Sequence, residues 1–395
     1  MISKKMEMLG KQPSAIRKIF EYSNARKKEI GAENVYDFSL GNPSIPAPKK
    51  VNETIIKFIN ERESIALHGY TSGPGDMNTR TVIANNINKR FSFPVTADNI
   101  YMTCGAAASL EITLNAICNK GDEVIALTPY FPEYKVFIEN ADAKCVEVPC
   151  KQEDLTIDVK AVKKALNKKT KAIIVNSPNN PTGVVYSEEN IKELTDALSE
   201  FSKKRKEPVY IICDEPYREL VYGGVSVPYI PNIYDNTIVC YSYSKSLSLP
   251  GERIGYIMVS PNAEDSSDIY AAVCGAGRAL GYVCAPSLFQ YVVAECDGLD
   301  PDILEYDKNR MLIYESLKEI GYDVIRPDGA FYLFFKALES DAAAFCEKAK
   351  KYELLLVPSD SFGIKGYVRI AYCVTNDQIK RSIPAFRKLY EEYNK

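Results

Sequence analysis

The sequence predicts an α/β fold: a large domain with a mostly parallel sheet sandwiched by helices, plus a smaller α+β domain. Two observations support this prediction. Between about residues 98 and 260, short runs rich in β-branched and aromatic residues alternate with amphipathic helical segments. After about residue 286 the pattern changes to longer helices and a few short strands. The length of 395 residues leaves room for roughly two to three domains.

The N-terminal residues are expected to form an arm followed by an amphipathic helix, with apolar side chains at helical spacing at Ile16, Ile19 and Phe20. A strand over residues 35–40 should follow and end at Gly41-Asn42-Pro43. The backbone N–H groups of this triplet are little obstructed, which suits an anionic ligand. We expect residues 1–45 to form the arm and part of the small domain.

Residues 46–286 are expected to form the large domain. Its six clearest strands are predicted at residues 124–127, 143–148, 172–175, 209–213, 237–241 and 254–259. Right-handed crossovers place helices on both faces of such a sheet, and ligands bind at the carboxyl ends of its strands. Residues 287–395 are expected to form the small C-terminal domain, with helices and short strands at 287–296, 302–320, 331–335, 354–356, 368–371 and 377–393.

The composition favours a cytoplasmic protein that acts on small molecules. The net charge is −3, and no basic block suggests nucleic-acid binding. Eleven cysteines are scattered without a Cys-x-x-Cys pair, which favours free thiols over disulfides or a zinc site. The single histidine, His68, excludes His-rich metal sites and is expected to be exposed or simply hydrogen-bonded. No apolar run reaches the length of a membrane span, and the first residues lack a signal-peptide core.

The segment from Ser242 to Arg253 carries the candidate catalytic residue, Lys245. Lys245 is expected in a polar loop between two buried strands, where loops commonly carry chemistry. Partial desolvation and a second cation at Arg253 would lower the lysine pKa, so that its neutral amine could act as a nucleophile and form a Schiff base. Taken alone, a lysine in a serine-rich loop is more often a solvated surface residue, so the other motifs must decide.

Four further motifs carry candidate site residues, and three of them follow predicted strands. Small residues after Gly105 begin a helix, whose open N–H groups suit a phosphate. Phe131, held between two prolines, could stack on a planar ligand. The constrained loop around Asn180 fixes an amide that can donate a hydrogen bond. Asp214 ends an apolar strand, three residues before Tyr217, and a buried carboxylate there needs a cationic partner such as a protonated ring nitrogen.

Two glycine-rich segments fit nucleotide motifs poorly. Gly69–Asp76 lacks the Gly-Lys-Ser/Thr ending of a phosphate-binding P-loop. Gly275–Gly281 has one residue too many for a dinucleotide fingerprint and follows a helical segment rather than a strand.

Taken together, the motifs Asn-Asn-Pro-Thr-Gly, Asp-Glu-Pro-Tyr and Ser-Tyr-Ser-Lys, with an arginine eight residues after the lysine, resemble those of fold type I pyridoxal-phosphate enzymes. More narrowly, the chain resembles the class I/II aminotransferases, over nearly its whole length. That resemblance implies an aspartate aminotransferase-like fold, a large domain that binds pyridoxal 5'-phosphate, no metal, and a homodimer.

The resemblance also implies roles for individual residues. Lys245 would form the Schiff base and then move the substrate α-proton. Asp214 would keep the pyridine nitrogen protonated, while Asn180 and Tyr217 would bind the ring oxygen and Phe131 would stack on the ring.

The remaining implied roles concern the two anionic groups. The phosphate would be bound by Tyr70 of the neighbouring subunit and by Gly105, Ala106, Ala107, Ser242 and Arg253. The α-carboxylate of the substrate would be bound by Arg369 as a bidentate pair, assisted by Asn180 and Gly41. The departure from the usual pattern is Ala106-Ala107, where many relatives carry hydroxyl or amide side chains.

Several alternatives stay open on the sequence. A C–S lyase acting by β-elimination, a decarboxylase or a cyclising lyase would share the same cofactor site. A non-catalytic regulator that retains the fold is disfavoured by the intact Lys245, and a nicotinamide oxidoreductase would rest on Gly275–Gly281 alone. The sequence does not identify the amino acid or the 2-oxo acid, and Arg17 and Arg278 are candidates for a dicarboxylate preference without spacing to support them.

Overall fold

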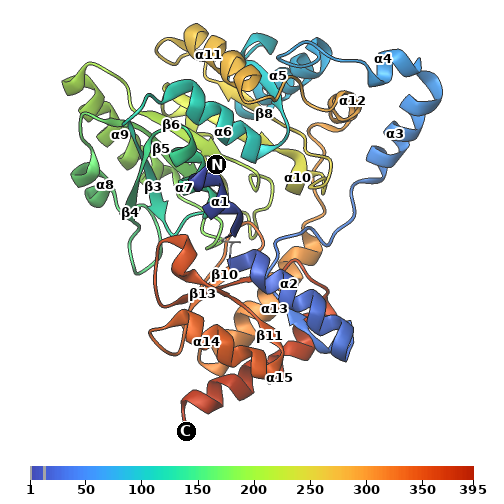
Figure 1. Cartoon of the computed structure of the whole chain (residues 1–395), viewed down its shortest axis with the longest axis vertical. Helices are drawn as coiled ribbons and strands as arrows, with labels where there is room; N and C mark the ends of the chain where they lie inside the picture. Colours follow the sequence, from blue (N-terminus) through green and yellow to red (C-terminus); the bar gives the residue numbers. More distant parts are fainter. Residues whose placement is uncertain (1, 12–14) are drawn as a thin grey trace.

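A computed structural model describes residues 2–11 and 15–395. Its centre is a seven-stranded sheet, seen as the core of the upper body in Figure 1. The strand order is β2 (Ile100–Thr103), β8 (Gly255–Val259), β7 (Thr237–Ser242), β6 (Tyr210–Asp214), β5 (Thr170–Asn176), β3 (Glu123–Thr128) and β4 (Lys144–Pro149). Only β8 runs antiparallel to its neighbours, so the predicted mostly parallel sheet is confirmed.

Helices cover both faces of the sheet because its strands are apolar on both sides. In β3, for example, Ile125 and Leu127 belong to one core cluster and Val124 and Ala126 to the other. The first face is covered by α5 (Met77–Phe91), α8 (Val159–Ala165), α9 (Glu188–Arg205) and α12 (Ser287–Cys296). The second face is covered by α6 (Ala106–Ile117), α7 (Glu133–Asn140) and α11 (Ser266–Ala279).

The lower body in Figure 1 has its own sheet and core. The antiparallel sheet has the order β12 (Val357–Pro358), β13 (Tyr367–Ala371), β10 (Tyr332–Lys336) and β9 (Val324–Ile325). Three helices pack with it: α13 (Leu304–Ile320), α14 (Ala342–Ala349) and α15 (Asn376–Tyr393). The predicted α+β pattern of this part is confirmed.

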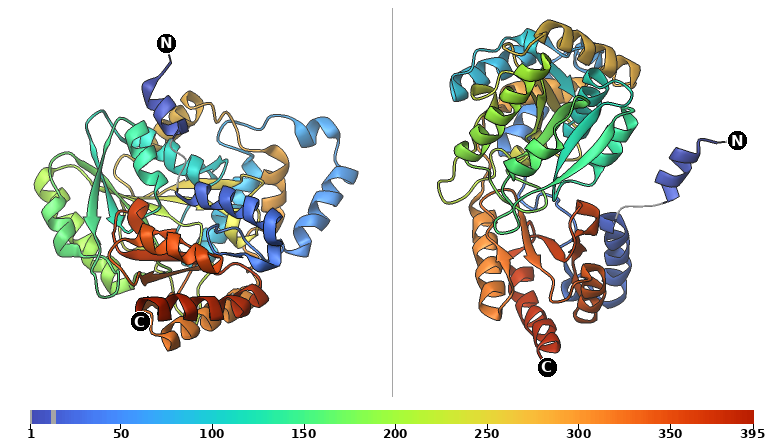
Figure 2. Two further views of the ribbon diagram at one scale, coloured as in Figure 1. Left: turned by 60° about the horizontal axis from the view of Figure 1, so that its bottom comes forward. Right: turned by 90° about the vertical axis from the view of Figure 1, so that its left-hand side faces the viewer.

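The N-terminal segment joins the lower body, as expected, but its elements differ from the prediction. The strand expected over residues 35–40 is only β1 (Tyr36–Asp37), which pairs in parallel with β11 (Leu354–Leu355). The predicted helix is α2 (Ala15–Ile30), and Lys27 on it is 2.9 Å from the carboxylate of Asp37. A further short helix, α1 (Lys4–Lys11), precedes it at the edge of the molecule in Figure 2, where Lys5 donates a hydrogen bond to the carbonyl oxygen of Glu139 on α7 at 3.0 Å.

Two helices, α3 (Lys49–Glu61) and α4 (Ser64–His68), form a projecting lobe, which is seen in Figure 1 and in the left view of Figure 2. The lobe is attached to the large body through α12, which contacts α3, α4 and α5. His68 is exposed at the end of α4 rather than in a loop. Within the described residues, no helix has the length and apolar character of a membrane span.

Candidate active site

The main candidate site is a cavity of about 290 Å³ at the carboxyl ends of β5, β6 and β7, where the two bodies meet. It brings together residues from segments far apart in the sequence. Eleven of the predicted site residues line it: Gly41, Ala106, Ala107, Phe131, Asn180, Asp214, Tyr217, Ser242, Lys245, Arg253 and Arg369. Gly105 lies directly beside it, and Tyr70 does not line the cavity of its own chain.

Lys245 lies in a short helix, α10 (Tyr243–Ser246), and not in the polar loop that was predicted. The helix begins as β7 ends, because the Oγ of Ser242 accepts a hydrogen bond from the backbone N–H of Ser244 at 3.2 Å. The Nζ of Lys245 donates to the carbonyl oxygen of Gly41 at 2.8 Å. Burial is the main cause that lowers the pKa of Lys245 to about 8; Cys373 opposes this shift, and the charges of Arg253 and Arg369 contribute to it.

Asp214 stands at the end of β6 with one carboxylate oxygen unpaired. Its Oδ2 accepts a hydrogen bond from the hydroxyl of Tyr134 on α7, whereas its Oδ1 is buried and has no hydrogen-bond partner. Burial raises the Asp214 pKa to about 7, against the opposing effect of the Tyr134 hydrogen bond. A buried carboxylate oxygen without a partner is costly, so this site is built for a donor that the protein itself does not supply.

Tyr217 and Asn180 reach the cavity from the loops that follow β6 and β5. The hydroxyl groups of Tyr217 and Tyr332 lie 2.9 Å apart and share one hydrogen bond. Burial raises the pKa of Tyr217 well above its usual value, so its hydroxyl remains protonated. The side-chain oxygen of Asn180 accepts from Arg369, which leaves its NH₂ group available as a donor.

Arg369 is the buried cation on the lower wall of the cavity, carried by β13. Its Nη1 donates to Asn180 at 3.2 Å and its Nη2 donates to the carbonyl oxygen of Ser39 at 2.6 Å. The guanidinium carbon lies 4.7 Å from the ring centre of Tyr332, and Nε has no partner. The described chain offers Arg369 no carboxylate, so its charge is available to an anionic ligand.

The opposite end of the cavity has the features of an anion site. Gly105 precedes α6 with a φ of 89°, and a Cβ added there would lie 3.0 Å from the guanidinium of Arg253. The first N–H groups of α6, at Ala106 and Ala107, therefore face the cavity beside a cation and the hydroxyl of Ser242. The side chains of Ala106 and Ala107 add no donors, so the backbone carries this part of the binding.

Phe131 and Tyr70 occupy very different positions. Phe131 lines the cavity beside Asp214 and packs edge-on against Tyr134, with ring centres 5.7 Å apart. Tyr70 follows the projecting lobe and is 93% exposed. Within its own chain it therefore lacks the partly buried environment that is typical of a side chain that binds a ligand.

The residues present fit pyridoxal 5'-phosphate. The unpaired Oδ1 of Asp214 would accept from a protonated ring nitrogen, and the N-terminal end of α6 with Arg253 would hold a phosphate. Lys245 supplies a partly buried amine between these two ends. No group of three acidic, histidine or cysteine side chains in residues 2–11 and 15–395 could hold a metal.

Sequence reasoning missed two tyrosines in this site. Tyr332 contacts both Arg369 and Tyr217, and Tyr134 binds the carboxylate of Asp214. With 27 tyrosines in the chain, neither stood out. The only signal was positional: Tyr134 lies in the first turn of α7, directly after the Pro-Tyr-Phe-Pro motif.

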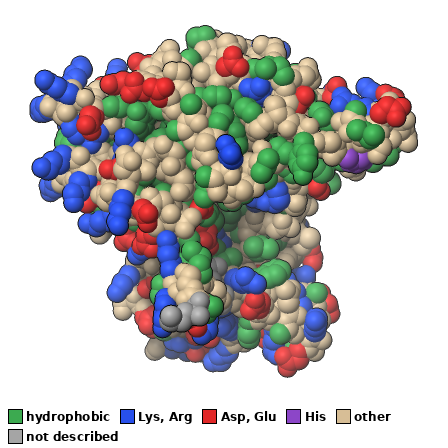
Figure 3. All heavy atoms as spheres, turned by 45° about the horizontal axis from the view of Figure 1, so that its top comes forward, with side chains coloured by type: hydrophobic (Ala, Val, Ile, Leu, Met, Phe, Trp, Pro, Cys, Tyr) green, Lys and Arg blue, Asp and Glu red, His purple; other side chains and the backbone are tan. Residues whose placement is uncertain are grey.

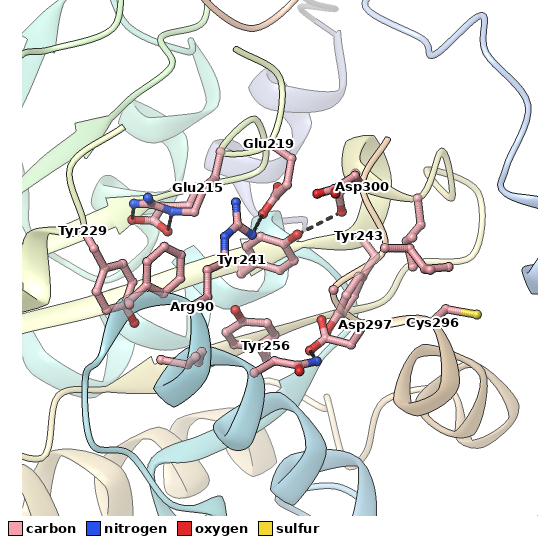
Figure 4. A pocket seen from close by; sticks show the side chains of 18 residues that line it. Arg90, Glu215, Glu219, Tyr229, Tyr241, Tyr243, Tyr256, Cys296, Asp297 and Asp300 are labelled. Atoms are coloured by element: carbon pink, nitrogen blue, oxygen red, sulfur yellow. Dashed lines mark hydrogen bonds and ion pairs between the residues drawn. The ribbon is translucent and has the colours of Figure 1, made fainter. Parts of the chain in front are cut away.

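A second, smaller cavity lies behind α10, and Figure 4 shows its polar lining. The hydroxyl of Tyr243 donates to Asp297 at 2.8 Å, and that of Tyr241 donates to Ser246 at 2.9 Å. These bonds attach the back of α10 to β7 and to the segment after α12. They hold the turn that presents Lys245 to the main cavity.

The glycine-rich segment Gly275–Gly281 begins inside α11 and is not the turn after a strand. The nicotinamide alternative thereby loses its one motif. All eleven cysteines are free in the structure.

Comparisons with known proteins agree with the resemblance that the sequence motifs indicated. Residues 32–386 match the family model described as aminotransferase class I and II. A solved aminotransferase from Eubacterium rectale is 55% identical, with a TM-score of 0.98 and full coverage of both chains. A protein of Methanocaldococcus jannaschii named probable aspartate aminotransferase is 30% identical, over 96% of this chain and 98% of its own. Aromatic-amino-acid aminotransferase 2 of Thermococcus litoralis is 26% identical, over 99% and 98%.

Proposed function

The chain belongs to the class I and II aminotransferases, and from this premise we propose how its residues divide the work. It is a pyridoxal-phosphate-dependent enzyme that moves an amino group between an L-amino acid and a 2-oxo acid. When bound, the cofactor supplies an aldehyde that carries the amino group and a ring that takes up electrons. The observation that carries the proposal is the Lys245 amine, with its lowered pKa, opposite the unpaired oxygen of Asp214.

We assign the proton transfer to Lys245. With the cofactor bound, its neutral amine would take the proton from the substrate α-carbon and hold it for the second proton transfer of the half-reaction. Gly41 orients the amine through its carbonyl oxygen. Arg369 holds the α-carboxylate with Asn180 beside it, so the α-carbon stays within reach of the lysine.

The other residues hold the cofactor. Asp214 accepts from the ring nitrogen, and Asn180 and Tyr217 donate to the ring oxygen. Phe131 packs on the ring face. The phosphate is bound by the backbone N–H groups that follow Gly105, at Ala106 and Ala107, and by the side chains of Ser242 and Arg253.

The experiment is a half-reaction followed by its products. The purified enzyme, loaded with pyridoxal phosphate, should lose its yellow absorbance when an amino acid is added and regain it with a 2-oxo acid. Borohydride reduction followed by peptide mapping should place the cofactor on Lys245. Formation of pyruvate and ammonia without consumption of a 2-oxo acid would instead favour the lyase.

Lys245→Ala should abolish the half-reaction and leave the far-UV spectrum unchanged. Lys160→Ala, which removes an exposed helical lysine on α8, is the matched control and should keep wild-type activity. A colourless wild-type protein that binds no cofactor would contradict the assignment of the site.

We propose further that the enzyme is a homodimer in which Tyr70 reaches the phosphate of the partner subunit. The elements on either side of Tyr70 in the sequence, and the segment after α11, carry exposed apolar side chains: Ile56, Ile59, Ile65, Met77 and Val283. Apolar side chains are visible on the surface beside the projecting lobe in Figure 3. Such a patch is typical of a subunit interface.

Two coarser expectations complete the proposal. The unpaired state of all eleven thiols supports a reducing compartment, so we place the enzyme in the cytoplasm. We also propose the division into an arm with part of the small domain (1–45), a cofactor-binding domain (46–286) and a small domain (287–395).

A further inference from the structure

Tyr332 contacts two ligand-binding side chains of the cavity, although the proposed function gives it no task. It lies on β10, the strand that pairs with β13. Its hydroxyl lies 2.9 Å from the hydroxyl of Tyr217, and the guanidinium carbon of Arg369 lies 4.7 Å from its ring centre. All three side chains are buried within one chain, so these contacts do not depend on a partner subunit.

The ring of Tyr332 is confined on the side that faces the catalytic lysine. A Cβ built on Gly41 would collide with the Tyr332 hydroxyl, so glycine at this position leaves the space that the hydroxyl occupies. The carbonyl oxygen of the same Gly41 accepts from Lys245 at 2.8 Å. On its other side the ring packs edge-on against Tyr217, with ring centres 5.7 Å apart. Tyr332 is therefore fixed between the backbone that holds the lysine and the side chain of Tyr217.

The direction of the hydrogen bond between the two hydroxyl groups follows from the task of Tyr217. A hydroxyl group has one proton to donate and can accept two hydrogen bonds. In the proposed function Tyr217 donates its proton to the ring oxygen of the cofactor, so it must accept the proton of Tyr332. Burial raises the pKa of Tyr332 to about 12 and that of Tyr217 well above its usual value, so both groups keep their protons.

We propose that Tyr332 is a positioning residue with two separate effects. Its hydroxyl donates to Tyr217 and thereby directs the Tyr217 proton toward the ring oxygen of the cofactor. Its ring lies over the guanidinium of Arg369 and holds that group in place for the α-carboxylate of the substrate. This inference rests on the proposed function and on the roles of Tyr217 and Arg369 in it.

The effect of the hydroxyl is tested through the absorbance of the bound cofactor rather than through turnover. A hydrogen bond to the ring oxygen stabilises the form that has lost its proton, so weakening that bond should raise the pH at which the absorbance changes. Tyr217→Phe should raise it by about one pH unit, the equivalent of one hydrogen bond. Tyr332→Phe should raise it by about half as much, because Tyr217 keeps its hydroxyl but loses the bond that directs its proton.

The double variant Tyr217→Phe/Tyr332→Phe distinguishes an indirect effect from a direct one. If Tyr332 acts on the ring oxygen through Tyr217, the double variant should titrate within about 0.3 pH units of Tyr217→Phe. Additive shifts, or an unshifted titration in Tyr332→Phe, would overturn the proposal and leave the aminotransferase activity standing. An unshifted titration in Tyr217→Phe would instead contradict the role that the proposed function gives to Tyr217.

The effect of the ring is tested through KM for the amino acid with the highest turnover. Tyr332→Phe retains the ring, so its KM should stay within about twofold of the wild-type value. Tyr332→Met removes the ring but fills part of the same space, and it should raise KM about tenfold, with a smaller change in kcat. Equal KM values in the two variants, both with wild-type far-UV spectra, would overturn this part of the proposal.

Tyr372→Phe is the matched control for the loss of a buried hydroxyl. Tyr372 lies in the same core, and its hydroxyl donates at 3.1 Å to the carbonyl oxygen of Ala330, which also accepts from Tyr222. It does not line the cavity, so its variant should keep the wild-type titration and KM. A Tyr372→Phe enzyme that shifts as far as Tyr332→Phe would show a general disturbance of this core and would overturn the specific role of Tyr332.

Discussion

At the level of single residues, the site depends on two buried ionisable groups whose charged forms are disfavoured. The amine of Lys245 has a pKa of about 8, mainly because it is buried. Only the neutral amine is a nucleophile, so the rate at which the cofactor-free protein takes up pyridoxal phosphate should rise as the pH increases through about 8. Stopped-flow absorbance from pH 6 to 10 measures this rate. A flat profile would contradict the lowered pKa.

Asp214 gives a second pH effect, on stability. Its folded pKa of about 7 lies above the unfolded value of 3.8, because burial disfavours the carboxylate. The folded state then binds more protons between these values, so this group's contribution to stability falls as the pH rises from about 4 to 7. The full effect is about 4 kcal/mol, at 1.36 kcal/mol per pKa unit.

Denaturant unfolding of the cofactor-free protein measures this decline. Asp214→Asn cannot titrate, so its stability should not show this decline between about pH 4 and 7. The stability difference between wild type and variant should therefore vary with pH. Bound cofactor should also flatten the profile, because it supplies the donor that Oδ1 lacks.

Tyr134 should act on the site through Asp214. Tyr134→Phe removes a buried hydrogen bond and should cost about 1–3 kcal/mol of stability. Because that bond lowers the Asp214 pKa, the decline in stability should also move to higher pH. Tyr130→Phe is the control, since the Tyr130 hydroxyl binds Glu147 outside the cavity. A Tyr134 variant with an unshifted profile would show that the bond does not tune the carboxylate.

The residue scale also shows what the sequence could predict. Lys245 and Asp214 were singled out because each carries a charge at the end of an apolar strand, whereas the role of Arg369 was implied by the family resemblance. Tyr134 and Tyr332 escaped because a tyrosine in an apolar segment is compatible with simple packing. Their roles follow from hydroxyl groups whose directions depend on the fold.

At the level of elements, strand prediction succeeded where a strand is buried on both faces. The six predicted strands of the large sheet match the observed ones to within one or two residues. β1 was predicted too long, because its partner β11 lies more than 300 residues away and offers only two pairing positions. α10 was missed because a four-residue helix leaves no periodicity to detect.

The turn before α6 allows an element-level prediction with a close control. Gly105 has a φ of 89° and contacts Arg253, whereas Gly121 has a φ of 90° and open space around it. Alanine at either position should cost about 1–2 kcal/mol of stability through backbone strain. Only Gly105→Ala should also weaken cofactor binding, because its Cβ would displace the guanidinium. Equal cofactor affinities in the two variants, measured by fluorescence titration, would exclude this role of the turn.

At the scale of the whole molecule, the cavity lies between two bodies, and its floor comes from both. Gly41 belongs to the N-terminal segment and Arg369 to β13, while Asp214 ends β6 and Lys245 lies in α10, directly after β7. Sequence patterns predicted both bodies, but the placement of residue 41 beside Lys245 depends on the pairing of β1 with β11. The predicted boundary at residue 286 stays a prediction, and α12, directly after it, packs against α3 and α5.

The homodimer gives the most demanding prediction at this scale. Tyr70→Ala should weaken cofactor binding, and Lys245→Ala should be inactive, so each variant alone fails at limiting cofactor. If Tyr70 acts across the interface, a mixed dimer contains one site with both native residues. Random exchange of equal amounts should then restore about a quarter of the wild-type activity, because half of the dimers are mixed and each has one intact site. The double variant mixed with itself is the control. Absence of recovery, with subunit exchange verified by native mass spectrometry, would mean that Tyr70 does not serve the partner site.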